Sequence, residues 1–529
     1  MDRVEAYLAG LPVSASADPR PVVFFNASTR ISRLSLNAAF GLLASWSVRA
    51  SGIPVRYWVC QQGMDLCVLG TDRRRPTGLP PCADCLDFSD RLFPPSLRVP
   101  LVFSPPDLSV ASLQDATAEE LGRWVWKGLP LGELCMPSLR WALRRHHLVD
   151  DSETRLLLRR YLISAASLAE QVEARLRSEP PRALVVFNGI TYPEAVAKAI
   201  AERSGVRVIT HEIGLRPFSA FFSRDHATFR KVALPAESPW TDTERGVLQE
   251  WIRSRTRGDF TMAGIRFWPR MQPIPRGLRR AIPRFRQMAA VFPNVIFDTS
   301  QVHANTIFPD MFAWLDSLVP VIRAHADTLF VVRAHPDEDR RGKESQEPVA
   351  DWFHDRGLDQ EVNTFFIGPR ELVSSYELLH QAKLVLIYSS SVGLESAMLG
   401  KPVLSAGRAR FSHVSIGWTA RDADHYRETL EQLLRAARVD VPEEYSEQAR
   451  RWLHYEAFHA SLDLSPFLEA DPGHPGMVGF RAFEPSAVAA NPCLRVIRAG
   501  IVHGDQPFVM PIDGHNKSMS EPAQSKGPS

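Results

Sequence analysis

A polar turn near residue 390 separates an apolar run from a helix-like segment, in YSSSVGLESAMLGKPV at residues 388–403. Its three consecutive serines are Ser389, Ser390 and Ser391. Serine hydroxyls and the free N–H groups of a helix N-terminus bind anions, and the helix dipole favours negative charge there. We therefore expect a phosphate at this turn, with Gly393 allowing close approach of the backbone and Glu395 accepting hydrogen bonds from a ribose. Compensation of the helix dipole is the alternative role for Glu395.

A second polar segment follows another apolar run, in FVVRAHPDE at residues 330–338. In open α/β sheets ligands bind beyond the carboxyl ends of strands, so Arg333 and His335 are candidates to contact the same anion. Pro336 biases His335 towards an extended conformation. The structural alternative is that His335 caps the strand and Arg333 pairs with an acid. The sequence has no Gly-rich dinucleotide fingerprint and no Walker loop, which favours a sugar nucleotide over other nucleotides.

The N-terminal half has polar residues at comparable positions, within residues 185–217. Asn188 ends an apolar run and Glu194 opens a helix, so we assign both to an acceptor side, although helix capping also explains Glu194. His211 and Glu212 end the next apolar run. Glu212 has no capping role there, so it is a candidate catalytic or substrate-binding carboxylate, with a salt bridge as the alternative. His211 is an alternative base or a partner of Glu212.

Four of the six cysteines lie close together in the sequence, and we call them the cysteine cluster: Cys60, Cys67, Cys82 and Cys85. Four thiolates with one C-x-x-C pair can bind a tetrahedral zinc ion or an iron–sulfur cluster. The intervening loop, rich in Gly, Pro and Arg, has little apolar surface with which to order itself. Plain small buried thiols are the competing interpretation.

Short apolar runs separated by helix-length segments must position these residues. Continuous runs of this kind are typical of parallel strands that are covered on both faces, and they predict an α/β fold. The main runs are PVVFF (21–25), ALVVF (183–187), VRVIT (206–210), NVIF (294–297), TLFVV (328–332), NTFFI (363–367), LVLIY (384–388) and KPVLSA (401–406).

The runs form two groups, separated by a segment rich in Pro and Arg at residues 266–287. Prolines at this density prevent a regular helix or central strand, so we interpret the segment as a linker. We expect an N-terminal α/β domain at 1–265 that carries the cysteine loop at 60–85, and a C-terminal α/β domain at 288–470. The polar, small-residue composition of 471–529 predicts an irregular tail with a disordered end.

The bulk composition is that of an ordinary globular protein. The 529 residues include 62 Lys plus Arg and 60 Asp plus Glu, a formal charge of +2 that excludes a global nucleic-acid footprint. No apolar run approaches the ~18 residues of a membrane-spanning helix, and the start lacks a signal-peptide pattern. We expect a cytoplasmic protein, with arginines of the linker, such as Arg276, Arg279 and Arg280, as candidates for peripheral contact with the inner membrane face.

The two C-terminal motifs together resemble the capsule polysaccharide biosynthesis glycosyltransferases, the family that includes the Kdo transferases of capsule export. RAHPDE and YSSSVGLESAMLGKPVL occur in that family's order, and the resemblance extends over about residues 294–407. It implies a GT-B-like fold, with two Rossmann-like domains facing a central cleft. It also implies that His335-Pro336 and Ser389-Ser390 or Ser390-Ser391 contact the donor phosphate.

The resemblance implies transfer of a sugar from a nucleotide-sugar donor, with CMP-linked sugars as candidates, to a glycan or lipid-linked acceptor. We expect a metal-independent, inverting enzyme without a catalytic cofactor, in which Glu212 removes the acceptor proton while His335 and the serines hold the leaving phosphate. Two alternatives stay open: an isomerase resembling nucleotide-sugar 2-epimerases, and a non-catalytic protein that binds or assembles glycans.

Overall fold

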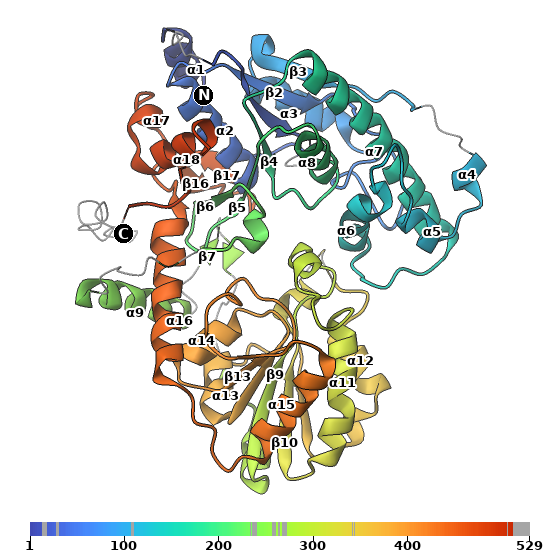
Figure 1. Ribbon diagram of the computed structural model, residues 1–529, viewed down its shortest axis with the longest axis vertical. Coiled ribbons are helices and arrows are strands. Elements are labelled where there is room, and N and C mark those ends of the chain that lie inside the picture. The colour runs from blue at the N-terminus through green and yellow to red at the C-terminus, as the bar shows by residue number, and fades with distance from the viewer. Residues whose placement is uncertain are drawn as a thin grey trace.

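The computed structural model describes residues 1–12, 18–27, 31–106, 111–232, 234, 241–256, 261–262, 265–266, 272–340, 342, 344–504 and 506–511. The chain forms two lobes, each built around a largely parallel sheet (Figure 1). The first lobe contains the N-terminal half of the chain and the last described helices. The second lobe contains most of the C-terminal half. The predicted α/β fold with two Rossmann-like domains is confirmed.

The first lobe is built on a seven-stranded sheet. Its first five strands in chain order are parallel, while β6 and β15 are antiparallel to their neighbours. Val and Phe side chains fill both faces of the central strands, as expected for strands covered on both sides. The spatial order is β15 (Leu462–Asp463), β6 (Ser219–Ser223), β5 (Val208–Ile213), β4 (Ala183–Phe187), β1 (Val22–Asn26), β2 (Val55–Cys60) and β3 (Arg98–Leu101).

Helices cover both faces of this sheet. One face packs against α1 (Asp2–Ala9), α2 (Leu36–Arg49), α3 (Cys82–Leu92), α17 (Ala487–Ala490) and α18 (Pro492–Val502). The other packs against α4 (Ala111–Gln114), α5 (Ala118–Gly122), α6 (Leu131–Leu143), α7 (Ser152–Ser178) and α8 (Glu194–Arg203). Short 3-10 segments are η1 (Pro95–Leu97) and η2 (Ala227–Phe229).

The second lobe is built on a six-stranded sheet in which every pair of neighbours is parallel. The spatial order is β11 (Thr364–Ile367), β10 (Thr328–Arg333), β9 (Gln287–Phe292), β12 (Leu384–Ile387), β13 (Val403–Ser405) and β14 (Trp418–Thr419). One face packs against α11 (Met311–Ala324), α12 (Val349–Asp355) and α15 (Ala423–Arg435). The other packs against α9 (Asp242–Thr256), α10 (Arg276–Ala281), α13 (Ser375–Gln381), α14 (Val392–Met398) and α16 (Glu443–Tyr455).

The central strand β9 corrects one prediction. The apolar run at 294–297 was expected to be a strand, whereas the strand is the preceding QMAAVF segment, Gln287–Phe292. Pro293 has no N–H to donate to the sheet, so the ladder stops before the apolar run. The remaining short elements of this lobe are η3 (Ile282–Arg284), η4 (Thr299–His303), η5 (Pro336–Asp339) and η6 (Leu358–Gln360).

The predicted linker at 266–287 contains regular structure. Residues 267–271 lie outside the described residues, and the hairpin before them pairs β7 (Thr261–Met262) with β8 (Ile265–Arg266). Helix α10 then forms between Pro275 and Pro283, so the expectation that prolines prevent a helix here was wrong. The six residues from Arg276 to Ala281 contain no proline, and the buried Leu278 anchors them to the second lobe.

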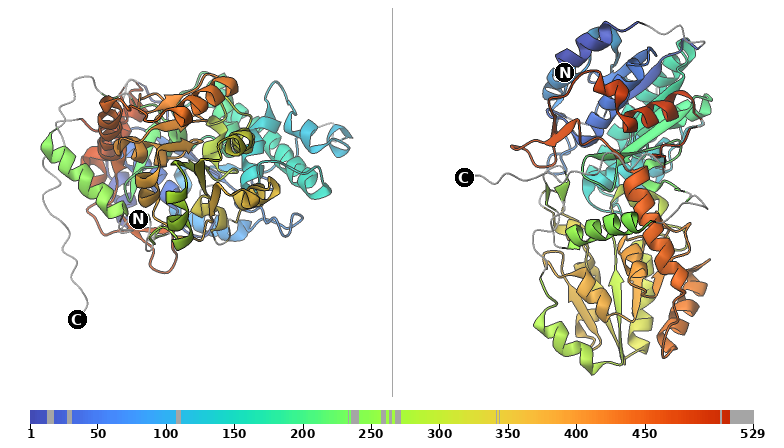
Figure 2. Two further views of the ribbon diagram at one scale, coloured as in Figure 1. Left: turned by 90° about the horizontal axis from the view of Figure 1, so that it is seen from below. Right: turned by 90° about the vertical axis from the view of Figure 1, so that its left-hand side faces the viewer.

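The chain returns to the first lobe after α16, which changes the predicted domain limits. Helix α16 runs along the side of the molecule next to α9 (Figure 2), and the π-helical segment η7 (Glu456–Ala460) leads into β15 at the edge of the first sheet. The predicted irregular tail at 471–529 instead includes helices α17 and α18 and the strand β17 (Val478–Phe480), which pairs with β16 (Leu468–Ala470) just before the tail. Apolar residues at helical spacing in α18 are buried against α2: Leu494, Ile497 and Ile501. Residues 512–529, predicted to be disordered, lie outside the described residues.

Candidate functional site

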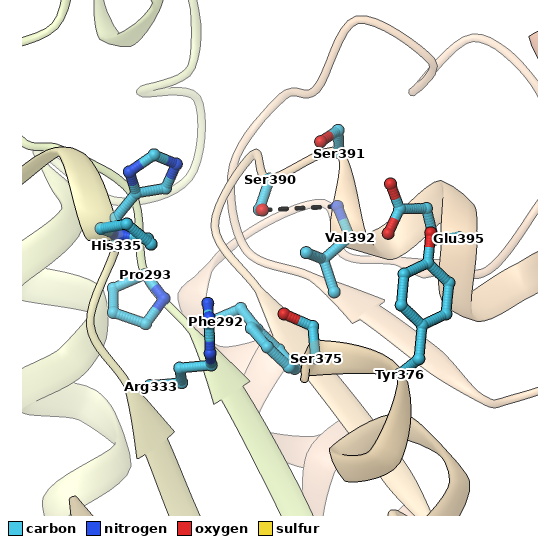
Figure 3. Close-up of a pocket in the computed structure, with 11 residues that line it drawn as sticks. Phe292, Pro293, Arg333, His335, Ser375, Tyr376, Ser390, Ser391, Val392 and Glu395 are labelled. Atoms are coloured by element: carbon cyan, nitrogen blue, oxygen red, sulfur yellow. Dashed lines mark hydrogen bonds between the residues drawn. The ribbon is translucent and has the colours of Figure 1, made fainter. Parts of the chain in front are cut away.

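The two predicted C-terminal motifs line one cavity at the carboxyl end of the second sheet (Figure 3). We call it the serine cavity. Its residues from the two motifs are Arg333, His335, Pro336, Ser390, Ser391, Val392 and Glu395, and the others are Phe292, Pro293, Ser375 and Tyr376. The convergence follows from strand order, because β10 and β12 both pair with β9, so their carboxyl ends flank the end of the same strand.

The tautomer of His335 is set by the backbone. Its Nδ1 accepts a hydrogen bond from the N–H of Asp337 at 3.1 Å, so the ring proton of the neutral imidazole is on Nε2. Burial, the larger effect, lowers the pKa of His335, and Asp337 opposes this shift. His335 therefore offers the cavity a neutral N–H donor rather than a positive charge.

Arg333 supplies the positive charge of the serine cavity. Its guanidinium is buried, with 5% of the residue exposed, and donates a hydrogen bond to the carbonyl of Val373 at 3.0 Å. Burial lowers the pKa of Arg333 to about 10, which leaves it cationic at neutral pH. A buried cation in a polar cavity attracts an anion strongly, because there is less water to screen its charge.

The three serines have different surroundings. The N–H of Ser389 donates to Oδ1 of Asn294 at 3.1 Å, which fixes the start of the turn. Oγ of Ser390 accepts from the N–H of Val392 at 3.4 Å, the dashed line in Figure 3. Ser391 is exposed and lines the serine cavity. Of the three hydroxyls, that of Ser391 is thus the one most open to a ligand.

The glycine and the acid after the turn occupy two different environments. A Cβ on Gly393 would come within 2.4 Å of Cδ1 of Ile387 and 3.2 Å of Phe411. The lack of a side chain therefore lets α14 pack onto β12, a different reason from the close ligand approach that we expected. Glu395 lies one turn into α14 and lines the serine cavity, where its contact with a ligand stays a prediction.

A second cavity, of about 280 Å³, lies between the lobes, and we call it the interlobe cavity. The first lobe contributes Leu215, Thr228 and Phe229, and the second contributes Ser389, Ser391, Leu394, Glu395, Arg408, Ala409, Arg410, Phe411, Trp452 and Leu453. Ser391 and Glu395 line both cavities, so the two are adjacent. The guanidinium of Arg408 lies 4.2 Å from the ring centroid of Phe229, a contact across the lobes.

Arg408 and Arg410 are site residues that our sequence interpretation missed. They follow β13 in the segment GRARF at 407–411. The signal was available, because polar residues just beyond a parallel strand lie at the ligand-binding edge of an α/β sheet.

Glu212 lies at the end of β5 among amide donors. Its carboxylate accepts hydrogen bonds from Nδ2 of Asn37 at 3.2 Å and Nδ2 of Asn188 at 3.5 Å. It also accepts from the N–H of Ile213 at 2.8 Å. Burial is the largest effect and raises the pKa of Glu212, while these hydrogen bonds and the charge of Arg410 oppose it. Glu212 is therefore within the electrostatic influence of an arginine that lines the interlobe cavity.

His211 points to a different environment from its neighbour Glu212, as expected for successive residues of a strand. Its ring centroid lies 5.3 Å from that of Phe222, and the residue is 4% exposed. Burial lowers the pKa of His211 to about 3. A histidine of such low pKa is a weak proton acceptor at neutral pH, so His211 is the less suitable of the two predicted bases.

The predicted acceptor residues have local structural roles. Oδ1 of Asn188 accepts from the N–H groups of Ile190 at 2.9 Å and Thr191 at 3.3 Å, while its amide donates to Glu212. Asn188 therefore orients Glu212. Glu194 is 0% exposed and accepts a hydrogen bond from Oγ1 of Thr191 at 3.2 Å. Contact of either residue with an acceptor stays a prediction.

The cysteine cluster is brought together in the first lobe. All four cysteines line one small cavity, which we call the cysteine cavity. It is formed by the end of β2, the loop after it and the first turn of α3.

Among the helices of the described residues, none combines the length and hydropathy needed to cross a bilayer.

Comparison with known proteins agrees with the C-terminal motifs. Residues 279–441 match the model of the family described as "Capsule polysaccharide biosynthesis protein". No curated protein matches the chain. Solved structures that resemble it include two of KpsC from Thermosulfurimonas dismutans. The structure named beta Kdo 2,4 transferase has 17% identity and a TM-score of 0.34, and the alignment covers 57% of this chain and 85% of that one.

The structure named beta Kdo 2,7 transferase has 15% identity and a TM-score of 0.31, covering 55% of this chain and 81% of that one. A UDP-GlcNAc 2-epimerase of Neisseria meningitidis has 11% identity and a TM-score of 0.25, covering 81% of this chain and 94% of that one. These TM-scores are all below 0.5, so the fold assignment depends on the two sheets themselves. The resemblance to the capsule polysaccharide biosynthesis family is confirmed over residues 279–441, which contain both the His-Pro and the serine motifs.

Proposed function

We propose that this chain is a glycosyltransferase of capsule or other cell-surface polysaccharide biosynthesis. It transfers a sugar from a nucleotide-sugar donor, with CMP-linked sugars as the first candidates, to a glycan or lipid-linked saccharide. The observation that carries the proposal is the convergence of Arg333, His335 and Ser391 on one cavity that adjoins the interlobe cavity.

The serine cavity suits a departing phosphate. Its cationic guanidinium, the Nε2–H of His335 and the hydroxyl of Ser391 are all donors, and Arg333 is buried. Donors that are already in place stabilise the charge that develops as the glycosidic bond to phosphate breaks. Arg333 thus performs the role that a divalent cation has in metal-dependent enzymes, and we propose that transfer needs none.

Glu212 is the proposed general base. In an inverting reaction the acceptor hydroxyl attacks the anomeric carbon, the bond from that carbon to the phosphate oxygen breaks, and the hydroxyl proton passes to Glu212. A raised pKa brings a carboxylate closer to the range in which it accepts a proton well at neutral pH. The amides of Asn37 and Asn188 hold the carboxylate in place.

The interlobe cavity is the proposed place for the donor sugar and the acceptor hydroxyl. It joins the serine cavity through Ser391 and Glu395, and Arg410 connects it electrostatically with Glu212. Peripheral contact with the inner membrane face through Arg276, Arg279 and Arg280 stays a prediction; all three are exposed on or beside α10.

The test begins with the donor. Thermal unfolding of the purified chain would be followed with CMP-, UDP-, GDP- and dTDP-linked sugars, because a ligand that binds the folded state raises the apparent Tm. The donor that stabilises the wild type would then be incubated with and without a glycan acceptor, without added Mg²⁺ or Mn²⁺. We expect sugar transfer only when the acceptor is present.

Ser391→Ala is the first variant, and Ser178→Ala, an exposed serine at the end of α7, is its matched control. We expect Ser391→Ala to weaken donor binding about 5- to 10-fold, the value of one ordinary hydrogen bond, and the control to bind as the wild type does. Release of an epimerised nucleotide sugar without acceptor would contradict the proposal in favour of an isomerase. Failure of every donor to shift the Tm would favour a non-catalytic glycan-binding protein.

A further inference from the structure

The cysteine cavity lies in the first lobe and is lined by groups that the proposed transfer reaction does not use. It is about 30 Å³ in volume, and apart from the cysteine cluster its lining is mainly apolar. The other lining residues are Ala27, Ile31, Gln62, Leu69, Gly70, Pro80, Pro81 and Leu86. Four sulfurs around a small space are the ligand set of a structural zinc site.

Two of the sulfurs accept hydrogen bonds from the backbone in the same way. The N–H of Gly63 donates to Sγ of Cys60 at 3.3 Å, and the N–H of Gly70 donates to Sγ of Cys67 at 3.2 Å. Each donor is three residues after its cysteine, so both cysteines belong to a C-x-x-G sequence with an N–H to sulfur hydrogen bond. N–H groups directed at sulfur orient a metal ligand.

Both turns require glycine. A Cβ on Gly63 would lie 2.6 Å from the carbonyl oxygen of Leu101, and one on Gly70 would lie 2.3 Å from Cβ of Pro80. The backbone at Gly63 therefore packs closely against Leu101, and the backbone at Gly70 packs closely against Pro80. The turns are fixed by packing, so the backbone at Cys60 and Cys67 is held in place before any ion binds.

The other two cysteines lie at the N-terminus of α3. Cys82 is the first residue of this 11-residue helix, and Cys85 follows three residues later. Residues three apart lie on the same face of a helix, so both sulfurs can reach one ion.

The cysteine cluster differs from the cysteine that packs in the core. Cys135 is 0% exposed within the helical layer of the first lobe, where it behaves as a small apolar side chain. The four clustered cysteines are only partly buried. The 21 residues between Cys60 and Cys82 contain no helix or strand. Met64, Leu66 and Val68 are buried in the core of the first lobe, whereas residues 69–81 have no buried side chain, so apolar burial does little to order this second part of the loop.

The loop between Cys60 and Cys82 also forms ion pairs with other parts of the fold. Arg160 of α7 binds Asp65 with Nε and Oδ2 2.7 Å apart. At its far side, Arg73 pairs with Glu344 of the second lobe at 3.7 Å. An ion that fixes the ends of this loop would therefore also stabilise a contact between the lobes.

We propose that Cys60, Cys67, Cys82 and Cys85 bind one structural zinc ion that closes the loop between β2 and α3. A volume of about 30 Å³ suits a single ion better than an iron–sulfur cluster, which carries its own iron and sulfide atoms. Zinc–sulfur bonds of about 2.3 Å require sulfurs roughly 3.8 Å apart, so binding draws the four side chains together.

Two other groups of side chains that could ligate a metal are more closely spaced, but some of their ligand atoms already make hydrogen bonds. Among the described residues, donor atoms within 4.8 Å of one another occur in His146, His147 and Asp310 and in Glu244, His454 and His459. Both ring nitrogens of His147 already face carboxylates, at 3.2 Å from Asp310 and 3.0 Å from Glu347. Nδ1 of His459 faces the carbonyl of Met510 at 3.3 Å.

The experiment measures metal in the purified full-length chain by elemental emission, after expression with added zinc. We expect about one zinc per chain in the wild type and in Cys493→Ser, a control that removes a partly buried cysteine outside the cluster. Cys82→Ser/Cys85→Ser is expected to hold less than about a tenth of that zinc. Cobalt in place of zinc should give the visible spectrum of a tetrahedral tetrathiolate site.

A measurement on the wild type alone keeps the test decisive if the double variant does not fold. Removal of zinc with a strong chelator should lower the Tm by several degrees and expose four additional thiols to alkylation, and added zinc should reverse both changes. A chain without bound metal, whose Tm does not respond to zinc or chelator, would overturn the proposal. Bound iron with acid-labile sulfide would overturn it in favour of a cluster. Neither outcome depends on transferase activity.

Discussion

The two lobes carry charged groups of opposite sign. The second lobe places Arg333 at the serine cavity and Arg408 and Arg410 at the interlobe cavity, and the first lobe holds the carboxylate of Glu212 at the end of β5. A displacement at an anomeric carbon needs a proton acceptor on one side of the reacting bond and stabilisation of a departing anion on the other. Because these groups are on separate lobes, the proposed transfer would require both lobes to be in place.

The lobes also hold their functional groups differently. Backbone groups of the second lobe fix Arg333 and His335, through the carbonyl of Val373 and the N–H of Asp337. In the first lobe, Glu212 depends on two side chains from separate segments, Asn37 of α2 and Asn188 after β4. We therefore expect substitutions in the second lobe to change donor binding, and substitutions in the first lobe to change the chemical step.

Glu212→Gln should have the greatest effect. The amide has the shape of the carboxylate and can still accept from Asn37, but it cannot take a proton. We expect kcat to fall about 10²- to 10⁴-fold, with the Kd for the donor changed less than about twofold. The measurements are initial rates of transfer and donor titration by calorimetry. Glu202→Gln, an exposed acid on α8, is the control, and a Glu212→Gln enzyme with more than half of the wild-type kcat would exclude Glu212 as the base.

The pH profile provides a second measure of the same group. A base must be deprotonated to act, so the rate is low below its pKa and rises as pH increases through it. Burial raises the pKa of Glu212 above the ordinary value of 4.5, so the rising limb of kcat/KM should lie above pH 4.5. The limb should be absent from the residual activity of Glu212→Gln. An identical limb in the variant would assign it to another group.

Arg333→Met should weaken donor binding at the second lobe, because Arg333 lines the serine cavity. Loss of a charge-assisted hydrogen bond to phosphate is expected to weaken donor binding about 10- to 100-fold. Arg333→Lys keeps the charge without the planar guanidinium and should lose less donor affinity; it provides the test if Arg333→Met does not fold.

Arg408→Met, in the interlobe cavity, should raise the acceptor KM and leave the donor Kd nearly unchanged. Equal loss of donor binding in both variants would show that the cavities do not divide the substrates in this way.

The second lobe was largely predictable because its functional residues directly follow continuous apolar strands. Arg333 and His335 follow one such run and Ser389 follows another, and parallel strands bring these ends to one edge. Sequence could not show which serine hydroxyl is open to a ligand, because this depends on the hydrogen bond that the N–H of Ser389 donates to Asn294 and on the one that Ser390 accepts from Val392. It also could not show that Gly393 serves helix packing, since Phe411 approaches it only in the folded chain.

The first lobe was less predictable because distant segments complete it. Nothing local to Glu212 reveals that Asn37, 175 residues earlier, donates to it. The edge strand β15 and helix α18 come from beyond residue 460, where Gly and Pro between short elements obscured the helical spacing of α18. The convergence of the cysteine cluster likewise depends on the turns at Gly63 and Gly70, which the spacing of the cysteines alone does not specify.

A histidine at the lobe contact gives the smallest predicted effect. Nε2 of His147 lies 3.2 Å from Asp310 and Nδ1 lies 3.0 Å from Glu347, both in the second lobe. These carboxylates raise the pKa of His147 from 6.5 to about 10. Because the pKa is raised on folding, the stabilisation is fully present below pH 6.5 and is lost as pH rises through about 10. The His147 side chain is 53% exposed, so water and salt screen the pair, and we expect a contribution of at most about 1 kcal/mol.

His147→Gln removes this charge. Its Tm should be below that of the wild type at pH 6 and low salt, and the two values should approach each other above pH 10 or in 1 M salt. Arg123→Gln is the control, because it breaks the exposed ion pair between Arg123 and Glu119 of α5, away from the second lobe. Its Tm difference from the wild type should not depend on pH or salt in this way. A Tm difference that is constant with pH and salt would mean that His147 acts through packing, for example against Phe312, whose ring centroid is 6.4 Å away, and not through charge. Such a result would also mean that the charge of His147 does not stabilise the contact between the lobes.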